Sequence, residues 1–80
     1  MDKIRLDKWL WAARFYKTRS LARQAIEHGK VEVEGQRAKP ARVLRGGETL
    51  KVERATELFE VTVLGLSDTR GPATVAQTLY

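Results

Sequence analysis

The residues of this chain that could do chemistry are cations grouped around one predicted turn. Arg19 and Arg23 are four residues apart, so a helix would place both side chains on one face. The turn at residues 16–20 adds Lys17, Thr18 and Ser20 beside the N-terminus of that helix. Cations, hydroxyls and backbone N–H groups at a helix N-terminus can bind phosphate. The pattern predicts a phosphate-binding corner, with ordinary capping by Thr18 and solvated cations as the alternative.

Further polar residues stand where they could extend this corner. Gln24 lies beside the two arginines and could contact a hydroxyl group or a base edge. Arg5 and Lys8 share one face of the first predicted helix. The remaining candidates lie toward the far end of that helix and on the first predicted hairpin: Arg14, Lys17, Lys30, Gln36, Arg37 and Lys39.

The charge of the chain is one-sided. Its 80 residues carry 15 Lys and Arg against 10 Asp and Glu, and residues 1–30 hold eight of the cations but three of the acids. Such an excess favours a polyanionic partner, because each neutralised phosphate releases counterions. The alternative is a solvated basic surface that serves solubility.

The residues present give little support to catalysis or metal binding. The chain has no cysteine, which removes disulfides, thiol nucleophiles and zinc–thiolate sites. Its one histidine, His28, precedes Gly29 at a predicted helix C-terminus, where a dipole partner is favoured over a catalyst. Asp2 and Asp7 have no base or metal partner, so they are a weak signal for acid–base chemistry. We expect no enzyme activity, cofactor, metal or small-molecule substrate.

The aromatic residues divide between core and surface. Trp9 falls on an apolar stripe and is predicted to be core, whereas Trp11 lies about 200° away around the helix. Phe15 and Tyr16 stand beside the basic turn and could stack on an unpaired base. Filling the gap between the helices is the favoured role of Phe15.

The length and hydropathy pattern limit the class of protein. A chain of 80 residues forms one small domain with little interior for a deep cleft. It lacks the roughly 20 successive apolar residues of a membrane span, and its N-terminus lacks an apolar signal region. We expect a cytoplasmic protein, monomeric and without a membrane partner.

The elements that must position these residues follow from two periodicities. Residues 5–16 and 19–28 show apolar residues at helical spacing, with Thr18 as N-cap of the second helix and Gly29 as its stop. The apolar stripe of that second helix uses Leu21 or Ala22, then Ala25 and Ile26. Alternating patterns predict strands at 30–34, 36–39, 49–54 and 58–65. The fold class is α+β, an N-terminal helical hairpin packed on a small antiparallel β-sheet. We expect one domain over residues 4–66 and a loosely structured tail over 67–80, where the uncapped Tyr80 is consistent with truncation.

Several motifs over residues 4–52 hold a recognisable spacing: Arg5-Leu6-Asp7-Lys8-Trp9-Leu10, Lys17-Thr18-Arg19-Ser20 with Ala22, Ala25-Ile26, and Gly29-Lys30-Val31-Glu32-Val33-Glu34-Gly35. This pattern resembles the alpha-L RNA-binding motif, or S-four domain, of ribosomal proteins, pseudouridine synthases and tyrosyl-tRNA synthetases. Residues 9–19, 35–40 and 66–73 further resemble the bacterial heat shock protein fifteen family.

The second resemblance implies a heat-induced protein that binds ribosomal RNA on free large ribosomal subunits carrying a nascent chain on tRNA. It also implies a role in rescue after aborted translation and a general affinity for RNA and DNA. Carried over by position, the RNA-binding residues are Arg5, Lys8, Arg14, Lys17, Thr18, Arg19, Ser20, Arg23, Gln24 and Lys30, with the turn at Gly35 and with Gln36, Arg37 and Lys39 at the far edge.

Two departures from the family pattern stand out. Many members have Asn before the hairpin glycine, where this chain has Glu34, whose charge would repel phosphate. Family members also usually continue into a basic C-terminal extension. The alternatives are the detached RNA-binding module of an RNA-modifying enzyme such as a pseudouridine synthase, a general RNA/DNA-binding protein, and a DNA-binding protein built on the helical hairpin.

Overall fold

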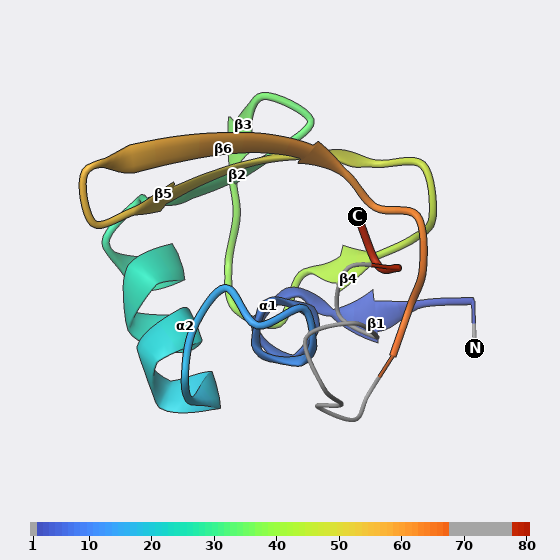
Figure 1. The fold of residues 1–80 in the computed structure, drawn as a ribbon, viewed down its shortest axis with the longest axis horizontal. Helices are drawn as coiled ribbons and strands as arrows, with labels where there is room; N and C mark the ends of the chain where they lie inside the picture. The colour runs from blue at the N-terminus through green and yellow to red at the C-terminus, as the bar shows by residue number, and fades with distance from the viewer. Residues whose placement is uncertain (1, 68–77) are drawn as a thin grey trace.

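The computed structural model describes residues 2–67 and 78–80. Its elements are β1 (Ile4–Arg5), α1 (Leu6–Ala12), α2 (Arg19–Glu27), β2 (Val31–Val33), β3 (Gln36–Arg37), β4 (Val43–Leu44), β5 (Thr49–Arg54) and β6 (Glu57–Thr62). A four-stranded antiparallel sheet in the order β3-β2-β5-β6 lies over the helical hairpin, and β1 pairs with β4 beside it (Figure 1). The predicted α+β fold is confirmed.

Local capping explains where α2 begins and ends. The Thr18 hydroxyl accepts a hydrogen bond from the Leu21 backbone N–H at 3.1 Å. At the other end Gly29 adopts φ +76°, and the N–H of Lys30 reaches back to the carbonyl of Ala25. This is the left-handed helix stop that Gly29 predicted. His28 is the C-cap and not the last helical residue that the sequence pattern predicted.

The first helix is shorter than its apolar pattern predicts. It ends at Ala12, because Arg14 adopts φ +66° and the N–H of Phe15 bonds to the carbonyl of Leu10 at 3.0 Å. This arrangement is a helix stop usually built on glycine. The predicted extension to residue 16 is therefore wrong, and so is the placement of Arg5 on this helix, because Arg5 lies in β1.

The sheets also differ in detail from the prediction. The observed strands are shorter than predicted at 30–34, 36–39 and 58–65, and the β1–β4 pair was not expected. That pair has two residues in each strand, which is too short to show a period. In α2 the stripe uses Ala22, which is fully buried, whereas Leu21 is exposed.

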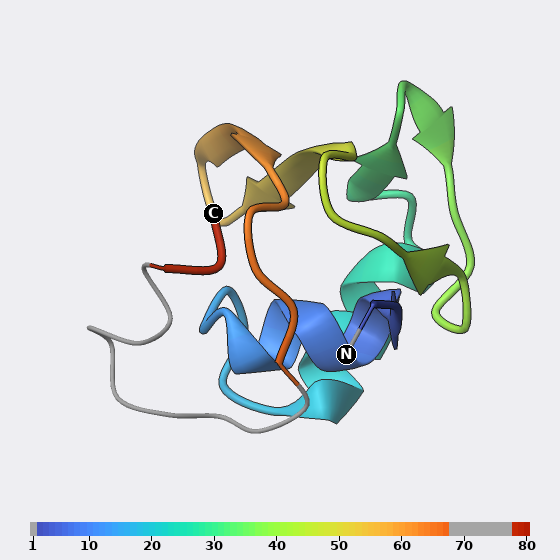
Figure 2. The same ribbon diagram turned by 90° about the vertical axis from the view of Figure 1, so that its right-hand side faces the viewer.

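The core sits between the helices and the four-stranded sheet. Trp9 is fully buried, as predicted, and its indole N–H donates to the carbonyl of Gly65 at 2.8 Å. The carbonyl of Leu79 accepts from the N–H of Leu64 at 2.8 Å, which brings the end of the chain between the sheet and α1 (Figures 1 and 2). The Tyr80 ring lies 4.8 Å from that of Phe15. Most of the predicted tail, residues 68–77, lies outside the described residues.

A glycine in the β5–β6 turn is expected to stabilise the fold. Ala55 is exposed at φ +54°, in the left-handed region that disfavours a Cβ, so Ala55→Gly should add about 0.5–1 kcal/mol to the free energy of unfolding. The melting temperature should rise by roughly 2–8 °C. The matched control is Thr56→Gly in the same turn, which should lower the melting temperature. Equal effects of the two changes would contradict the strain at Ala55.

Candidate nucleic-acid interface

A buried carboxylate organises the cations at the start of the two helices. Asp7 is the one buried charged residue in the part of the chain that the structure describes. It accepts hydrogen bonds from Arg5 Nε at 3.1 Å and Nη2 at 3.0 Å, and from the backbone N–H of Lys8 at 2.8 Å. Arg19 Nη2 lies 3.7 Å from its Oδ2. Two arginines from separate segments are thus held by one acid, while each stays nearly half exposed to solvent.

The backbone fixes Asp7 relative to the segment between β3 and β4. The N–H of Leu6 donates to the carbonyl of Arg42 at 2.8 Å, and that of Asp7 donates to the carbonyl of Pro40 at 3.2 Å. The first N–H groups of α1 are therefore satisfied by this segment, which descends from the sheet to the start of α1 (Figure 1). As a result, residues 37–40 lie beside the cations around Asp7.

Two hollows follow one flank of α2. The first, of about 300 Å³, is lined by Arg5, Asp7, Arg19, Ser20 and Arg23. The second, of about 440 Å³, is lined by Ile26, Glu27, Arg37, Ala38, Lys39 and Pro40. An ion pair of 3.5 Å between Arg23 and Glu27 joins them. We call the combined surface of these eleven residues the α2 groove.

Arg37 closes the far end of the α2 groove. Its Nη2 donates to the carbonyl of Glu27 at 2.6 Å, which ties the first hairpin to the last turn of α2. A Cβ on Gly29 would come within 3.3 Å of Arg37 Nε, so glycine serves both the helix stop and this close approach. The predicted candidates Arg5, Arg19, Ser20, Arg23, Arg37 and Lys39 are thus brought together on one flank.

The other predicted candidates lie elsewhere. Gln24 and Lys30 line a separate hollow of about 210 Å³ with Tyr16, His28 and Arg54. Gln36 lines a further hollow beside the α2 groove. Among the described residues, Lys8, Arg14 and Lys17 line none of these hollows, and the Thr18 hydroxyl is engaged in capping α2.

The β2–β3 turn has its own structural demands. Glu34 and Gly35 adopt φ +52° and +78°, the two positive values of a type I′ hairpin turn. The Glu34 carboxylate accepts a hydrogen bond from the backbone N–H of Thr49 at 2.6 Å. Glu34 stands where many family members have Asn, and its carboxylate lies against the backbone of β5.

The aromatic side chains beside the basic turn pack inward. Phe15 is buried, with its ring centroid 5.7 Å from that of Phe59, and Arg54 lies over both rings. Phe15 is therefore a core residue, as predicted, but its ring packs against Phe59 of the sheet and not in the gap between the helices. The Tyr16 hydroxyl donates to the carbonyl of Glu53 at 3.1 Å, and burial raises the pKa of this phenol. Trp11 is half-buried against the core.

Two residues that shape the surface carry no clear signal in the sequence. Asp7 is only a weak acid–base candidate there, because an isolated acid among cations gives no local indication of its partners. Arg42 was not singled out. It donates to Glu48 at 2.7 Å from Nη2 and at 3.3 Å from Nη1, across the β4 segment. The spacing of six residues in irregular chain matches no motif, so neither partner predicts the other.

The Arg42–Glu48 pair predicts a pH dependence of stability. The hydrogen bond from Arg42 lowers the pKa of Glu48 below its ordinary value of 4.5. An acid with a lowered pKa stabilises the fold above its unfolded pKa and loses that contribution as the pH falls through the folded value. The stability difference between the wild type and Glu48→Gln, measured by urea unfolding, should therefore shrink as the pH drops below about 4.5. A difference independent of pH would contradict the pair.

Two classes of site are not seen in the described residues. No group of three or more His, Asp or Glu side chains there could hold a metal ion. Within the same residues, no helix has the length and apolar character needed to cross a membrane.

Comparison with known proteins identifies the family. The S4 domain model matches residues 4–50. A heat shock protein 15 homolog of Aeromonas salmonicida is 54% identical over 98% of this chain and 59% of its own length. The RQC P-site tRNA stabilizing factor of Bacillus subtilis is 35% identical over 82% of this chain and 77% of its own length.

A solved structure agrees with the sequence comparison. The trimeric structure of heat shock protein 15 from Vibrio cholerae superposes with a TM-score of 0.95 at 48% identity, covering 99% of this chain and 80% of that one. The chain spans about three fifths of the length of the heat shock protein relatives it matches. The resemblance found in the sequence is confirmed: this chain belongs to the heat shock protein 15 family of S4-domain proteins.

Proposed function

We propose that this chain is a non-enzymatic RNA-binding protein of the cytoplasm that binds ribosomal RNA on the free large ribosomal subunit. The observation that carries the proposal is the α2 groove. It gathers Arg5, Arg19, Arg23, Arg37 and Lys39 from four segments of the chain onto one flank of a helix. Exposed arginines in fixed positions suit phosphate contacts, which position a protein on RNA through the shape of the backbone.

The proposal also specifies which state of the large ribosomal subunit this protein binds. One relative is named as a stabilizing factor of P-site tRNA, and others are named as heat shock proteins. These names support a subunit that still carries a nascent chain on tRNA as the target, with rescue after heat stress as the outcome. The monomeric state predicted from the sequence and a domain over residues 4–66 belong to the same proposal. Residues 78–80 are added to that domain, because Leu79 is buried in its core.

Co-sedimentation with purified large subunits tests this partner. Empty subunits and subunits carrying peptidyl-tRNA are compared across a salt series. We expect tighter and more salt-resistant binding to the loaded subunits. Equal, steeply salt-dependent binding to both would refute the rescue role and leave a general RNA-binding module. Displacement of structured RNA by an equal concentration of duplex DNA would instead favour a DNA-binding protein.

A further inference from the structure

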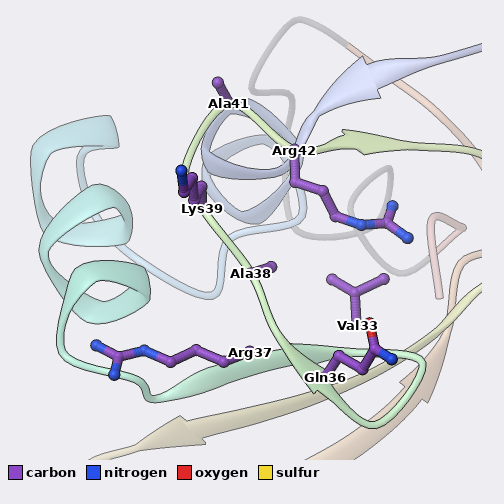
Figure 3. A pocket seen from close by; sticks show the side chains of 7 residues that line it. All are labelled: Val33, Gln36, Arg37, Ala38, Lys39, Ala41 and Arg42. Carbon is purple, nitrogen blue, oxygen red and sulfur yellow. The ribbon is translucent and has the colours of Figure 1, made fainter.

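The hollow that Gln36 lines adjoins the α2 groove and shares part of its wall. It measures about 400 Å³ and is lined by Val33, Gln36, Arg37, Ala38, Lys39, Ala41 and Arg42 (Figure 3). Arg37, Ala38 and Lys39 also line the α2 groove. The volume lies within the range of sites that hold a small organic group. An RNA backbone bound along the groove would therefore pass beside this opening.

The guanidinium of Arg42 is held in place at the wall of this hollow. It donates to the carbonyl of Val43 at 2.6 Å and to both carboxylate oxygens of Glu48. Glu48 in turn accepts from the backbone N–H of Arg45 at 2.7 Å. With its charge compensated by Glu48 and three of its five N–H donors engaged, this arginine is poorly suited to grip a phosphate. The side chain is 36% exposed, so part of it can be contacted by a ligand.

The rest of the hollow combines an apolar surface with one amide. Val33, Ala38 and Ala41 contribute aliphatic groups. The Gln36 side chain is exposed and points toward Arg42 across Val33 (Figure 3). Its amide carries two donor hydrogens and an acceptor oxygen, the groups needed to pair with a base edge.

We propose that this hollow receives one unpaired base of the bound RNA. The base stacks on the fixed face of Arg42 and rests on the aliphatic groups, while Gln36 hydrogen-bonds its edge. The flanking phosphates are contacted by Arg37 and Lys39, which the hollow shares with the α2 groove. This inference rests on the proposed function, because it requires that the groove binds RNA.

The test compares two RNA hairpins that differ in one nucleotide. One stem is fully paired, and the other carries a single unpaired nucleotide at its centre. We expect the wild type to bind the bulged stem about tenfold more tightly. Arg42→Lys keeps the charge but removes the flat group, so the preference should fall to less than about threefold with little change for the paired stem. Gln36→Ala should lower the preference by about threefold. The control is Arg45→Lys, the same change outside the hollow, which should keep the preference.

Each other outcome is decisive. If the wild type binds both stems equally, or if Arg42→Lys and Gln36→Ala keep the full preference, the inference is overturned while the RNA-binding function stands. If the wild type binds neither stem, the proposed function itself fails. Should Arg42→Lys unfold, as thermal melting would show, Gln36→Ala decides alone. If polyglutamate displaces the bulged stem from the wild type but not from Arg42→Lys, the hollow is an anion site and the inference is overturned.

Discussion

Replacing Arg19 and Arg23 together by alanine is expected to weaken RNA binding by about tenfold or more while leaving thermal stability nearly unchanged. Both side chains lie in the α2 groove, and they are 45% and 64% exposed. Their ion pairs are 3.7 and 3.5 Å long. The Arg23–Glu27 pair is exposed and contributes little to stability. Asp7 is buried, but without Arg19 it keeps its two shorter hydrogen bonds from Arg5, so the loss should fall on phosphate binding. Fluorescence anisotropy with a structured RNA and a thermal melt measure the two effects.

A matched double variant separates position from charge. Arg45 and Lys51 are exposed and line none of the four hollows described for residues 2–67 and 78–80. Arg45→Ala with Lys51→Ala removes the same charge and should lower RNA affinity by less than about threefold. Equal losses of RNA affinity in both double variants would mean that net charge, and not the α2 groove, determines binding. A large loss of stability with unchanged binding would show that Arg19 and Arg23 are structural.

Asp7→Asn is expected to weaken RNA binding although it makes the protein more positive. Asp7 holds Arg5 with two hydrogen bonds and lies 3.7 Å from Arg19. Without the carboxylate, both arginines must be ordered when RNA binds, at a cost of about 0.5–1.5 kcal/mol for each side chain. We expect a fall in RNA affinity of about fivefold or more. The free energy of unfolding should fall by about 1–2 kcal/mol, because a buried acceptor of charged hydrogen bonds is lost.

Whether Asp7→Asn lowers or raises RNA affinity tests the role of Asp7 in positioning the two arginines. Glu27→Gln is the matched control. Glu27 also lines the α2 groove, but its side chain is 54% exposed and, among the described residues, forms an ion pair with Arg23 alone. It should leave RNA affinity unchanged or slightly higher, as removal of a negative charge normally does. If Asp7→Asn raises affinity in the same way, Asp7 does not position the arginines.

Local signals account for what the sequence predicts correctly. Thr18 and Gly29 are end signals of a single helix, and the structure shows both acting as predicted. The two arginines of α2 are four residues apart, so helix geometry alone places them together. Trp9 follows from the same periodicity. These features depend on neighbours within one or two turns of chain.

Long-range packing accounts for what the sequence does not predict. The early end of α1 places Arg14 at positive φ, in a position usually held by glycine, because Phe15 turns into the core against Phe59. No local signal announces such a stop. The β1–β4 pair likewise joins residues 4–5 to residues 43–44, far apart in sequence.

The same distinction applies to the candidate site. The sequence predicts one continuous set of cations, but only the packed fold decides which of them share a flank of α2. Lys30 lies in a hollow away from Arg37, although both belong to the β2–β3 region. Asp7 and Arg42 gain their roles from partners that folding brings to them.

The salt dependence of binding to purified large ribosomal subunits tests the central claim most directly. If the five cations of the α2 groove each contact one phosphate, the logarithm of the affinity should fall against the logarithm of salt concentration with a slope of about −4.5. The variant with Arg19→Ala and Arg23→Ala should lose about two units of that slope. A slope near zero, or the same slope in both proteins, would contradict RNA binding through the α2 groove.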